Sequence, residues 1–223
     1  MEIDAVAFDI DGTLYPNGSM YFISIPLFLT NLKFFRAFGD VRRELRKLEI
    51  IEDIYQAQTA LLSEKMSITT MEAEKMINTI AYTRWIENFK KIRPYKELVS
   101  TVEQFRAAGL KTAVLSDFPL RDRLARMGLE GYWDTALSSE DSHYLKPHPK
   151  PFLLLAERLE VPPERILYVG NNYKYDVLGA QSVGMKTALI CRYLNKKVKP
   201  DIVFRSYTEL WEKVKALFLV GGD

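Results

Sequence analysis

Short apolar segments of strand length alternate along this chain with longer segments of helical periodicity, and this alternation constrains the fold most. The segments of strand length are Ala5–Ile10, Thr112–Leu115, Ile166–Val169, Lys186–Ile190 and Ile202–Phe204. Several of them lack polar positions, which is typical of strands that are buried on both faces. The helical segments between them include Lys96–Ala108, Pro151–Leu159 and Asp176–Val183. Strand–helix alternation of this kind predicts an α/β fold with a Rossmann-like parallel sheet flanked by helices.

The stretch from residue 16 to residue 92 interrupts the alternation and contains no clear strand. Apolar residues recur at helical spacing over residues 41–55 and 73–85, and Thr69-Thr-Met-Glu72 has the pattern of a capping box. We therefore expect an α/β core domain, residues 1–15 and 93–223, and an inserted all-helical cap domain, residues 16–92.

Aromatic residues are concentrated near the start of the expected cap. They are Tyr21, Phe22, Phe28, Phe34, Phe35 and Phe38. We expect them to form the core of the cap, and the alternative is that some line a substrate pocket or a partner surface. The cap also carries basic residues, among them Arg42, Arg43, Arg46 and Lys47. We expect these to form a solvated helix face, unless one of them binds a substrate carboxylate or a second phosphate.

The composition excludes several kinds of partner. The 223 residues include 31 basic and 29 acidic side chains, a net charge of +2, which provides no basic footprint for nucleic acid. The most apolar stretch, residues 20–38, carries Lys33 and Arg36, so we expect no contact with a membrane. The N-terminus lacks the features of a signal peptide and Cys191 is the single cysteine, which favours a cytoplasmic location. A monomer and a homodimer both remain open.

The first expected strand ends in two carboxylates spaced by two residues, Asp9 and Asp11, which are followed by Gly12. Carboxylates at the end of a buried strand are costly unless they have partners. Ligands of open α/β sheets bind beyond the carboxyl ends of the strands, so these residues lie where chemistry is expected. Gly12 permits a tight turn and a close approach of the backbone to a ligand.

Four segments in order resemble the motifs of the haloacid dehalogenase-like (HAD) phosphohydrolases. Phe8-Asp9-Ile10-Asp11-Gly12-Thr13-Leu14 resembles the nucleophile motif. Val114-Leu115-Ser116-Asp117 resembles the second motif, whose hydroxyl holds a phosphate oxygen, although Asp117 stands where Asn is common. Lys146-Pro147-His148-Pro149-Lys150-Pro151-Phe152 resembles the third motif, whose lysine faces the phosphate.

The fourth motif, an apolar strand followed by Gly-Asp and a later Asp, is matched with one departure. Gly170 and Asp176 fit the motif, but Asn171 stands where the family usually has Asp. An Asn oxygen can ligate Mg²⁺ without the negative charge, which predicts a weaker metal site or greater dependence on Asp9 and Asp176. The resemblance covers residues 1–15 and about 93–205, and the insertion lies where the family has helical C1-type caps.

The resemblance implies a Mg²⁺-dependent phosphomonoester hydrolase that acts on a small phosphorylated metabolite through an aspartyl-phosphate intermediate. The expected catalytic residues are Asp9, Asp11, Ser116 and Lys146. The expected substrate contacts are Gly12, Thr13 and Asp117. The expected Mg²⁺ ligands are Asp9, Asp11 through its main-chain carbonyl, Asn171 and Asp176.

Each catalytic residue has an expected role. An Asp with an ordinary pKa of about 3.9 is ionised at neutral pH, so Asp9 is available as the nucleophile. Asp11 would be the general acid and then the general base, which requires a side chain that is free to change partners. Ser116 and Lys146 would neutralise the phosphoryl charge as the transition state forms.

Three alternatives share parts of this pattern. A sugar-phosphate mutase of the same fold uses both Asp residues and a helical cap, and these motifs do not separate it from a hydrolase. A phosphate-binding module that has lost efficient turnover through Asn171 is also compatible with the sequence. A dehalogenase uses the same nucleophile but needs neither Asp11 nor Mg²⁺, so the second carboxylate argues against it.

Overall fold

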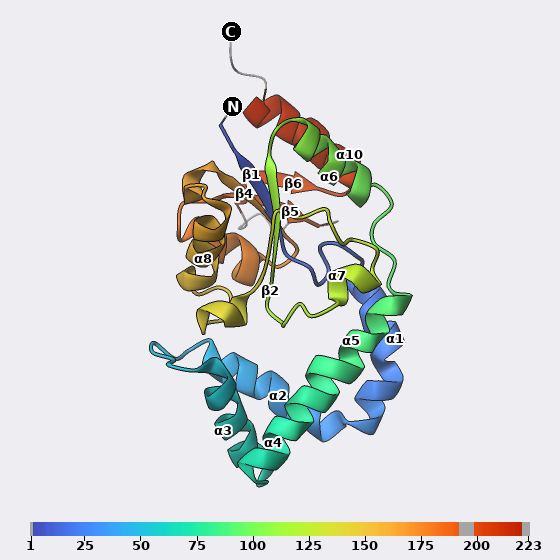
Figure 1. Cartoon of the computed structure of the whole chain (residues 1–223), viewed down its shortest axis with the longest axis vertical. Coiled ribbons are helices and arrows are strands. Elements are labelled where there is room, and N and C mark those ends of the chain that lie inside the picture. Colours follow the sequence, from blue (N-terminus) through green and yellow to red (C-terminus); the bar gives the residue numbers. More distant parts are fainter. Residues whose placement is uncertain (1, 192–198, 220–223) are drawn as a thin grey trace.

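The computed structural model describes residues 2–191 and 199–219, and its centre is a six-stranded parallel sheet. The strands lie in the order β3-β2-β1-β4-β5-β6 (Figure 1). Their bounds are β1 Ala5–Phe8, β2 Lys111–Ser116, β3 Thr135–Ser138, β4 Ile166–Gly170, β5 Lys186–Ile190 and β6 Ile202–Phe204. All five predicted strands are present and the predicted α/β class is confirmed, whereas β3 was not predicted.

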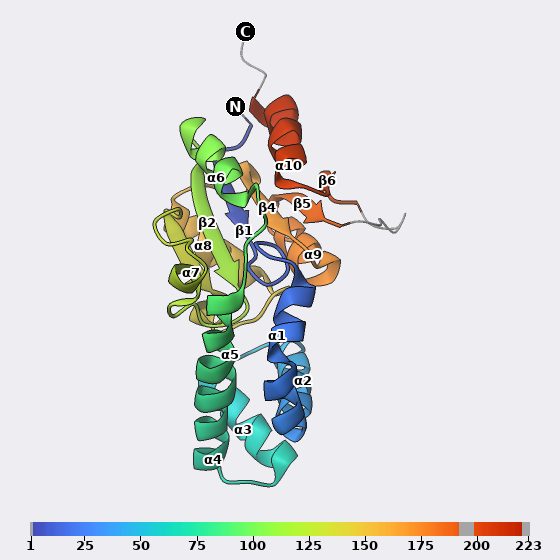
Figure 2. The same cartoon turned by 90° about the vertical axis from the view of Figure 1, so that its right-hand side faces the viewer.

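Helices cover both faces of the sheet (Figure 2). Side chains of a strand alternate between faces, so Val6 and Phe8 of β1 pack toward α6 (Leu98–Ala107) and α10 (Tyr207–Val214). Ala5 and Ala7 point to the other face, where α8 (Pro149–Leu159) and α9 (Leu178–Gln181) lie. Because both faces of β1 are covered, polar groups next to this strand can reach a ligand only at its two ends.

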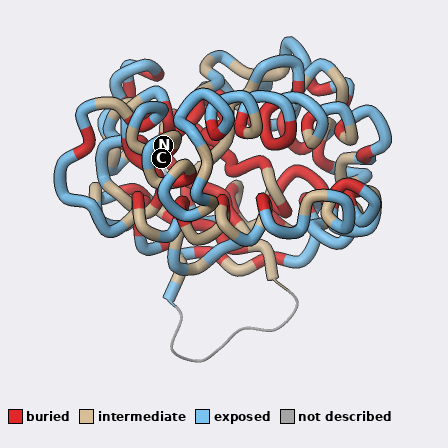
Figure 3. The backbone as a smooth tube through the Cα atoms, turned by 90° about the horizontal axis from the view of Figure 1, so that it is seen from below, coloured by how far each residue is buried: buried red, intermediate tan, exposed pale blue. Residues whose placement is uncertain are grey.

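Short elements connect these layers. They are α7 Arg123–Arg126, the 3₁₀ turns Ser139–Ser142 (η3) and Pro163–Arg165 (η4), and the π-helical segments Tyr173–Val177 (η5) and Lys215–Leu219 (η6). Buried residues concentrate inside the fold and exposed residues on the outer faces of the helices (Figure 3). No helix among the described residues is both long and apolar enough to cross a bilayer.

The stretch between β1 and α6 is helical throughout its regular elements. These are α1 Asn17–Thr30, α2 Leu32–Leu45, α3 Ile54–Met66, α4 Thr70–Met76, η1 Ile77–Arg84, α5 Trp85–Glu87 and η2 Asn88–Lys91. They extend away from the sheet at its carboxyl end (Figures 1 and 2). The boundaries at residues 16 and 92 stay a prediction.

The helical periodicity predicted for this stretch holds in one place and fails in another. The capping box starts α4, because Glu72 N donates to Thr69 Oγ1 at 3.2 Å and Thr69 N donates to the Glu72 carboxylate at 2.9 Å. The helical spacing over residues 41–55 does not correspond to one helix, because α2 ends at Leu45 and α3 begins at Ile54. Asp53 caps a new helix there by accepting from the backbone amides of Tyr55 and Gln56.

The aromatic run of the cap divides into three groups. Phe34 and Phe38 are buried in the cap core, as expected. Tyr21 is 64% exposed and Phe22 is 76% exposed, so the core prediction is wrong for these two. Phe28 and Phe35 are half-buried and line a cavity between cap and sheet. Only one face of α1 is buried, and Tyr21, Phe22 and Phe28 lie outside that face.

Candidate active site

The predicted site residues meet at the carboxyl ends of three neighbouring strands. Asp9 and Asp11 follow β1, Ser116 ends β2, and Gly170 ends β4 and leads to Asn171 and Asp176. A cavity of about 210 Å³ lies at this edge of the sheet. Its lining includes Asp9, Asp11, Asp117, Lys146, Asn171 and Asp176. We call it the phosphate cavity, because the motifs that line it resemble those of phosphohydrolases.

Lys146 joins the carboxylates of Asp9 and Asp176. Its Nζ lies 2.7 Å from Asp9 Oδ1 and 2.7 Å from Asp176 Oδ1, and it also contacts the Tyr168 hydroxyl at 3.2 Å. Burial opposes the charge of this ammonium, but Asp176 and Asp9 raise its pKa well above the ordinary value. The buried lysine therefore stays charged and compensates two buried carboxylates.

Asp9 is almost completely buried, which changes its titration from the expected one. Burial raises the pKa of Asp9 to about 7, the ammonium of Lys146 opposes this shift, and the carboxylates of Asp176 and Asp11 add to it. Asp9 Oδ2 accepts from the Thr13 hydroxyl at 2.9 Å. Lys146 and Thr13 thus stabilise the carboxylate form that a nucleophile needs.

Asp11 is held by two partners that the sequence did not suggest. Its Oδ1 accepts from the Tyr15 hydroxyl at 2.5 Å and from the Arg123 guanidinium at 2.6 Å. In this structure Asp11 is bound through one oxygen, so its expected freedom to change partners stays a prediction. Arg123 itself is fully buried, and its guanidinium carbon lies 4.4 Å from the Phe89 ring centroid. Its aromatic surroundings keep this cation pointed at Asp11.

Ser116 is tied to the same arginine. Arg123 donates to Ser116 Oγ at 2.7 Å, and the Phe118 backbone amide donates to that oxygen at 3.1 Å. Arg123 therefore connects the strand end of β2 with Asp11 of β1. The signal that could have identified it is spacing: Arg123 falls between Leu120 and Met127, on the apolar face of a short helix.

The loop after β4 is organised by Asp176. Its Oδ2 accepts from the backbone amides of Asn171 at 3.2 Å and Asn172 at 2.9 Å. Gly170 is required at this point, because a Cβ there would lie 2.3 Å from the Asp176 Cβ. Asn172, and not Asp176, caps the following turn by accepting from the Tyr175 amide at 3.0 Å.

Of the three residues predicted to contact the substrate, Thr13 and Asp117 have side-chain partners within the protein. Gly12 has a φ of +88°, which its lack of a side chain permits, and the hydroxyl of Thr13 is used on Asp9. Asp117 accepts from Ser139 at 2.8 Å and pairs with Arg46. Burial opposes the charge of Asp117, but Arg46, Lys146 and Arg42 lower its pKa to about 2.

Two basic residues of the cap are not a solvated face. Arg42 is 4% exposed and pairs with Glu140. It also donates to the Asp117 carbonyl and to the Gln58 side chain. Arg46 donates to the Lys146 carbonyl at 2.8 Å besides pairing with Asp117. Arg42 of α2 and Arg46, the residue after this helix, therefore attach the cap to the loops that carry Asp117 and Lys146. Arg43 and Lys47 are exposed, as expected.

Oxygen donors suited to Mg²⁺ are present, although the described residues contain no group of three His, Cys, Asp or Glu placed to hold a metal. Mg²⁺ is usually bound by one or two carboxylates and keeps several waters. A Cβ at Gly12 would lie 2.0 Å from the Asn171 amide nitrogen, so the glycine leaves room for this amide beside Asp11. Rotation of the amide exchanges its nitrogen and oxygen. Asp9, the Asp11 carbonyl and Asn171 therefore fit a magnesium ion.

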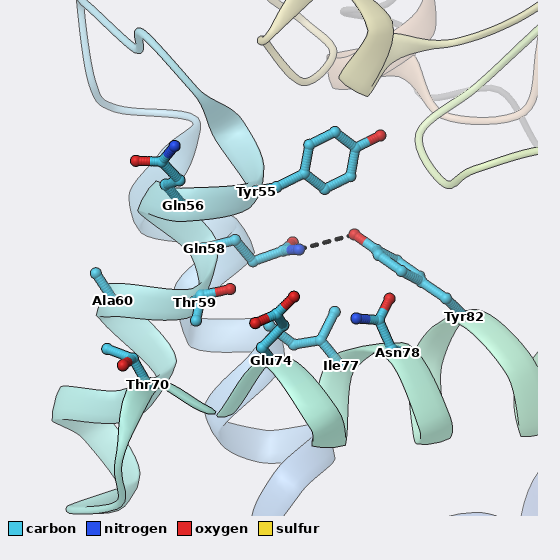
Figure 4. A pocket seen from close by; sticks show the side chains of 10 residues that line it. All are labelled: Tyr55, Gln56, Gln58, Thr59, Ala60, Thr70, Glu74, Ile77, Asn78 and Tyr82. Atoms are coloured by element: carbon cyan, nitrogen blue, oxygen red, sulfur yellow. Dashed lines mark hydrogen bonds between the residues drawn. The ribbon is translucent and has the colours of Figure 1, made fainter. Parts of the chain in front are cut away.

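A second cavity, of about 570 Å³, lies inside the cap between α3 and the helix formed by α4 and η1 (Figure 4). Gln58 donates to the Tyr82 hydroxyl across it at 2.7 Å. All the predicted site residues lie elsewhere. The same two residues bond to Arg42 and Glu140, which links this cavity to the cap–core junction.

A parallel sheet with an aspartate pair after its central strand, a buried lysine and a helical cap defines a class of hydrolase. The chain belongs to the haloacid dehalogenase-like hydrolases, because the model of that family matches residues 3–184. The predicted family and hydrolase class are thereby confirmed.

Individual relatives resemble nearly the whole chain at low identity. A glyceraldehyde 3-phosphate phosphatase from Methanopyrus kandleri is 28% identical over 89% of this chain and 88% of its own. The pyrophosphatase PpaX from Bacillus mycoides is 24% identical over 94% and 96%. The crystal structure of a HAD phosphatase from Thermococcus onnurineus superimposes with a TM-score of 0.65 at 26% identity, covering 95% of this chain and 98% of that one.

Proposed function

We propose that this chain is a Mg²⁺-dependent phosphomonoester hydrolase that acts on a small phosphorylated metabolite through an aspartyl-phosphate. The observation that carries the proposal is the meeting of two different carboxylates, Asp9 bound to Lys146 and Asp11 bound to Arg123, in one cavity. The phosphatase names of the relatives from Methanopyrus kandleri and Bacillus mycoides support the choice of phosphate.

The first step is attack of an Asp9 oxygen on phosphorus. The bond between phosphorus and the alcohol oxygen breaks, and Asp11 gives its proton to that oxygen. Tyr15 and Arg123 hold Asp11 through Oδ1, so the proton in transit is assigned to Oδ2. These two partners fix the position of the proposed general acid.

The second step is hydrolysis of the aspartyl-phosphate. Asp11, now a carboxylate, takes a proton from water, the water oxygen bonds to phosphorus, and the bond to Asp9 breaks to release inorganic phosphate. Lys146 contributes by neutralising Asp9 before attack and after its return, since the ammonium contacts Asp9 Oδ1 directly.

The proposed Mg²⁺ ligands are Asp9, the Asp11 main-chain carbonyl and Asn171. The ion would offset the repulsion between the phosphoryl group and the carboxylates. Asp176, the fourth expected ligand, also holds the loop after β4, because its oxygens accept from Lys146 and from the amides of that loop.

The test is hydrolysis of p-nitrophenyl phosphate by the purified protein with Mg²⁺ and with EDTA. We expect release that requires Mg²⁺ and falls roughly 10³-fold or more in Asp9→Asn. Asp4→Asn is the matched control, because Asp4 precedes the same strand at its opposite end. Acid quenching followed by mass spectrometry should find phosphate on Asp9 in the wild type. Activity that survives Asp9→Asn would contradict the nucleophile assignment.

A further inference from the structure

A cavity of about 420 Å³ adjoins the phosphate cavity on its cap side. Asp11, Asn17, Tyr21, Phe118 and Tyr175 line both cavities, so the two meet at these residues. A phosphomonoester with its phosphorus at Asp9 would extend past Asp11 into this second space. The volume is in the range of sites that hold a small organic molecule. We call it the aromatic cavity.

The walls of the aromatic cavity are dominated by rings. Eight lining side chains are aromatic, among them Phe28, Phe35, Trp85 and Phe118. Phe28 and Phe35 meet edge to face at 4.6 Å between centroids, and Trp85 and Phe118 do so at 4.9 Å. Rings arranged in this way present both faces and edges to an occupant, which favours another ring over a flexible chain.

The cations in the lining are already paired. Arg42 pairs with Glu140, Arg46 with Asp117, and Arg43 with Asp40 at the surface. Two of the guanidinium groups lie over rings, Arg42 at 4.3 Å from the Phe118 centroid and Arg46 at 4.4 Å from that of Tyr175. A second phosphate or a carboxylate would have to displace one of these partners, whereas a flat apolar group would not.

We infer that the preferred substrate is a phosphomonoester whose alcohol carries an aromatic ring, with the ring in the aromatic cavity. The inference rests on the proposed phosphatase function and specifies its substrate class. It separates this chain from relatives whose names indicate small charged substrates, glyceraldehyde 3-phosphate and pyrophosphate.

The first test compares kcat/KM for benzyl phosphate, ethyl phosphate and glycerol 1-phosphate. Their alcohols are all weak acids of similar strength, so a difference reports binding of the alcohol in the transition state. We expect benzyl phosphate to be preferred at least about 100-fold, since each methylene-sized apolar contact already gives about 10-fold or more. Equal rates, or a preference for glycerol 1-phosphate or added pyrophosphate, would overturn the inference.

Variants locate the effect in the cavity. Phe35→Ala removes a ring from the wall, and we expect it to lower kcat/KM for benzyl phosphate about 10-fold more than kcat/KM for ethyl phosphate. Phe22→Ala is the matched control on the neighbouring helix, because Phe22 is 76% exposed. An equal loss on both substrates in Phe35→Ala would contradict a role of this ring in selecting the alcohol.

A binding measurement separates the inference from the proposed function. Benzylphosphonate and ethylphosphonate have a carbon–phosphorus bond in place of the ester bond, so a phosphatase does not hydrolyse them. Calorimetry therefore measures their affinities without turnover. Tighter binding of benzylphosphonate by protein that hydrolyses none of the esters would uphold the aromatic cavity and refute the phosphatase. Equal affinities, beside Mg²⁺-dependent hydrolysis of all the esters, would uphold the phosphatase and refute the substrate class.

Discussion

The two cavities that meet at Asp11 are built in different ways. In the phosphate cavity each charged group is held by a named partner, as Lys146 is held between Asp9 and Asp176. In the aromatic cavity the walls are rings whose contacts are apolar and less directional, such as that between Phe28 and Phe35. The first arrangement tolerates few substitutions, whereas the second tolerates many rings of similar volume.

This difference explains a division of work between sheet and cap. Strand ends fix polar groups to within a hydrogen-bond length, which the proposed chemistry requires. In our proposal the cap adds a space whose shape and polarity select the alcohol. Arg42 and Arg46 lie at the boundary of sheet and cap, since both line the aromatic cavity and bond to loops of the core.

The strongest way to break the comparison is to remove Arg123. If it belongs to the catalytic end, Arg123→Met should lower kcat by about 10³-fold on every ester, because Asp11 loses the cation that positions it. Arg123→Lys should restore part of the rate, since it returns the charge without the planar fork.

A nearby arginine provides the control for that variant. Arg121 donates to the Tyr82 carbonyl at 2.7 Å, so Arg121→Met removes a similar side chain from the same segment. We expect its kcat to stay within about threefold of the wild type. An unchanged kcat in Arg123→Met, or a loss confined to benzyl phosphate, would place Arg123 outside the catalytic machinery.

The junction of cap and core is tested by Glu140→Gln. This change keeps the side-chain shape but leaves the buried Arg42 without its carboxylate partner. Breaking a buried pair in this way should lower the free energy of unfolding by about 3 kcal/mol, measured by urea denaturation. The exposed Glu64 supplies the control, and Glu64→Gln should change stability by less than about 0.5 kcal/mol. A loss below about 1 kcal/mol in Glu140→Gln would show that Arg42 needs no anion.

The sequence was sufficient to predict most of the catalytic end. Asp9, Ser116 and Gly170 could be placed together because parallel strands bring their carboxyl ends to one edge. Arg123 was missed because a run of charged residues suggests a surface helix, and its burial depends on rings from the cap, Trp85 and Phe89. Strand β3 was missed because its four residues, Thr135–Ser138, show no apolar pattern.

The cap end was less predictable for a physical reason. An aromatic side chain can lie in a core, on a cavity wall or on a surface, so the sequence alone does not distinguish Phe34, Phe28 and Phe22. Their places follow from how α1 and α2 pack against each other and against the core. The buried pair of Arg42 and Glu140 joins residues 98 positions apart, which no local pattern indicates.

The smallest expected effect concerns the departure from the family pattern at Asn171. Asn171→Asp places a carboxylate beside the turn that carries Asp11, so Mg²⁺ should bind about tenfold more tightly, or roughly 1.4 kcal/mol. Repulsion from Asp9 and Asp11 limits the gain and should make the metal-free protein slightly less stable. Calorimetric titration with Mg²⁺ measures the affinity directly. Asn172→Asp is the control, because Asn172 is adjacent but exposed and caps the turn at Tyr175. An equal gain in both variants would indicate a general effect of negative charge, and no gain in Asn171→Asp would remove residue 171 from the proposed ligands.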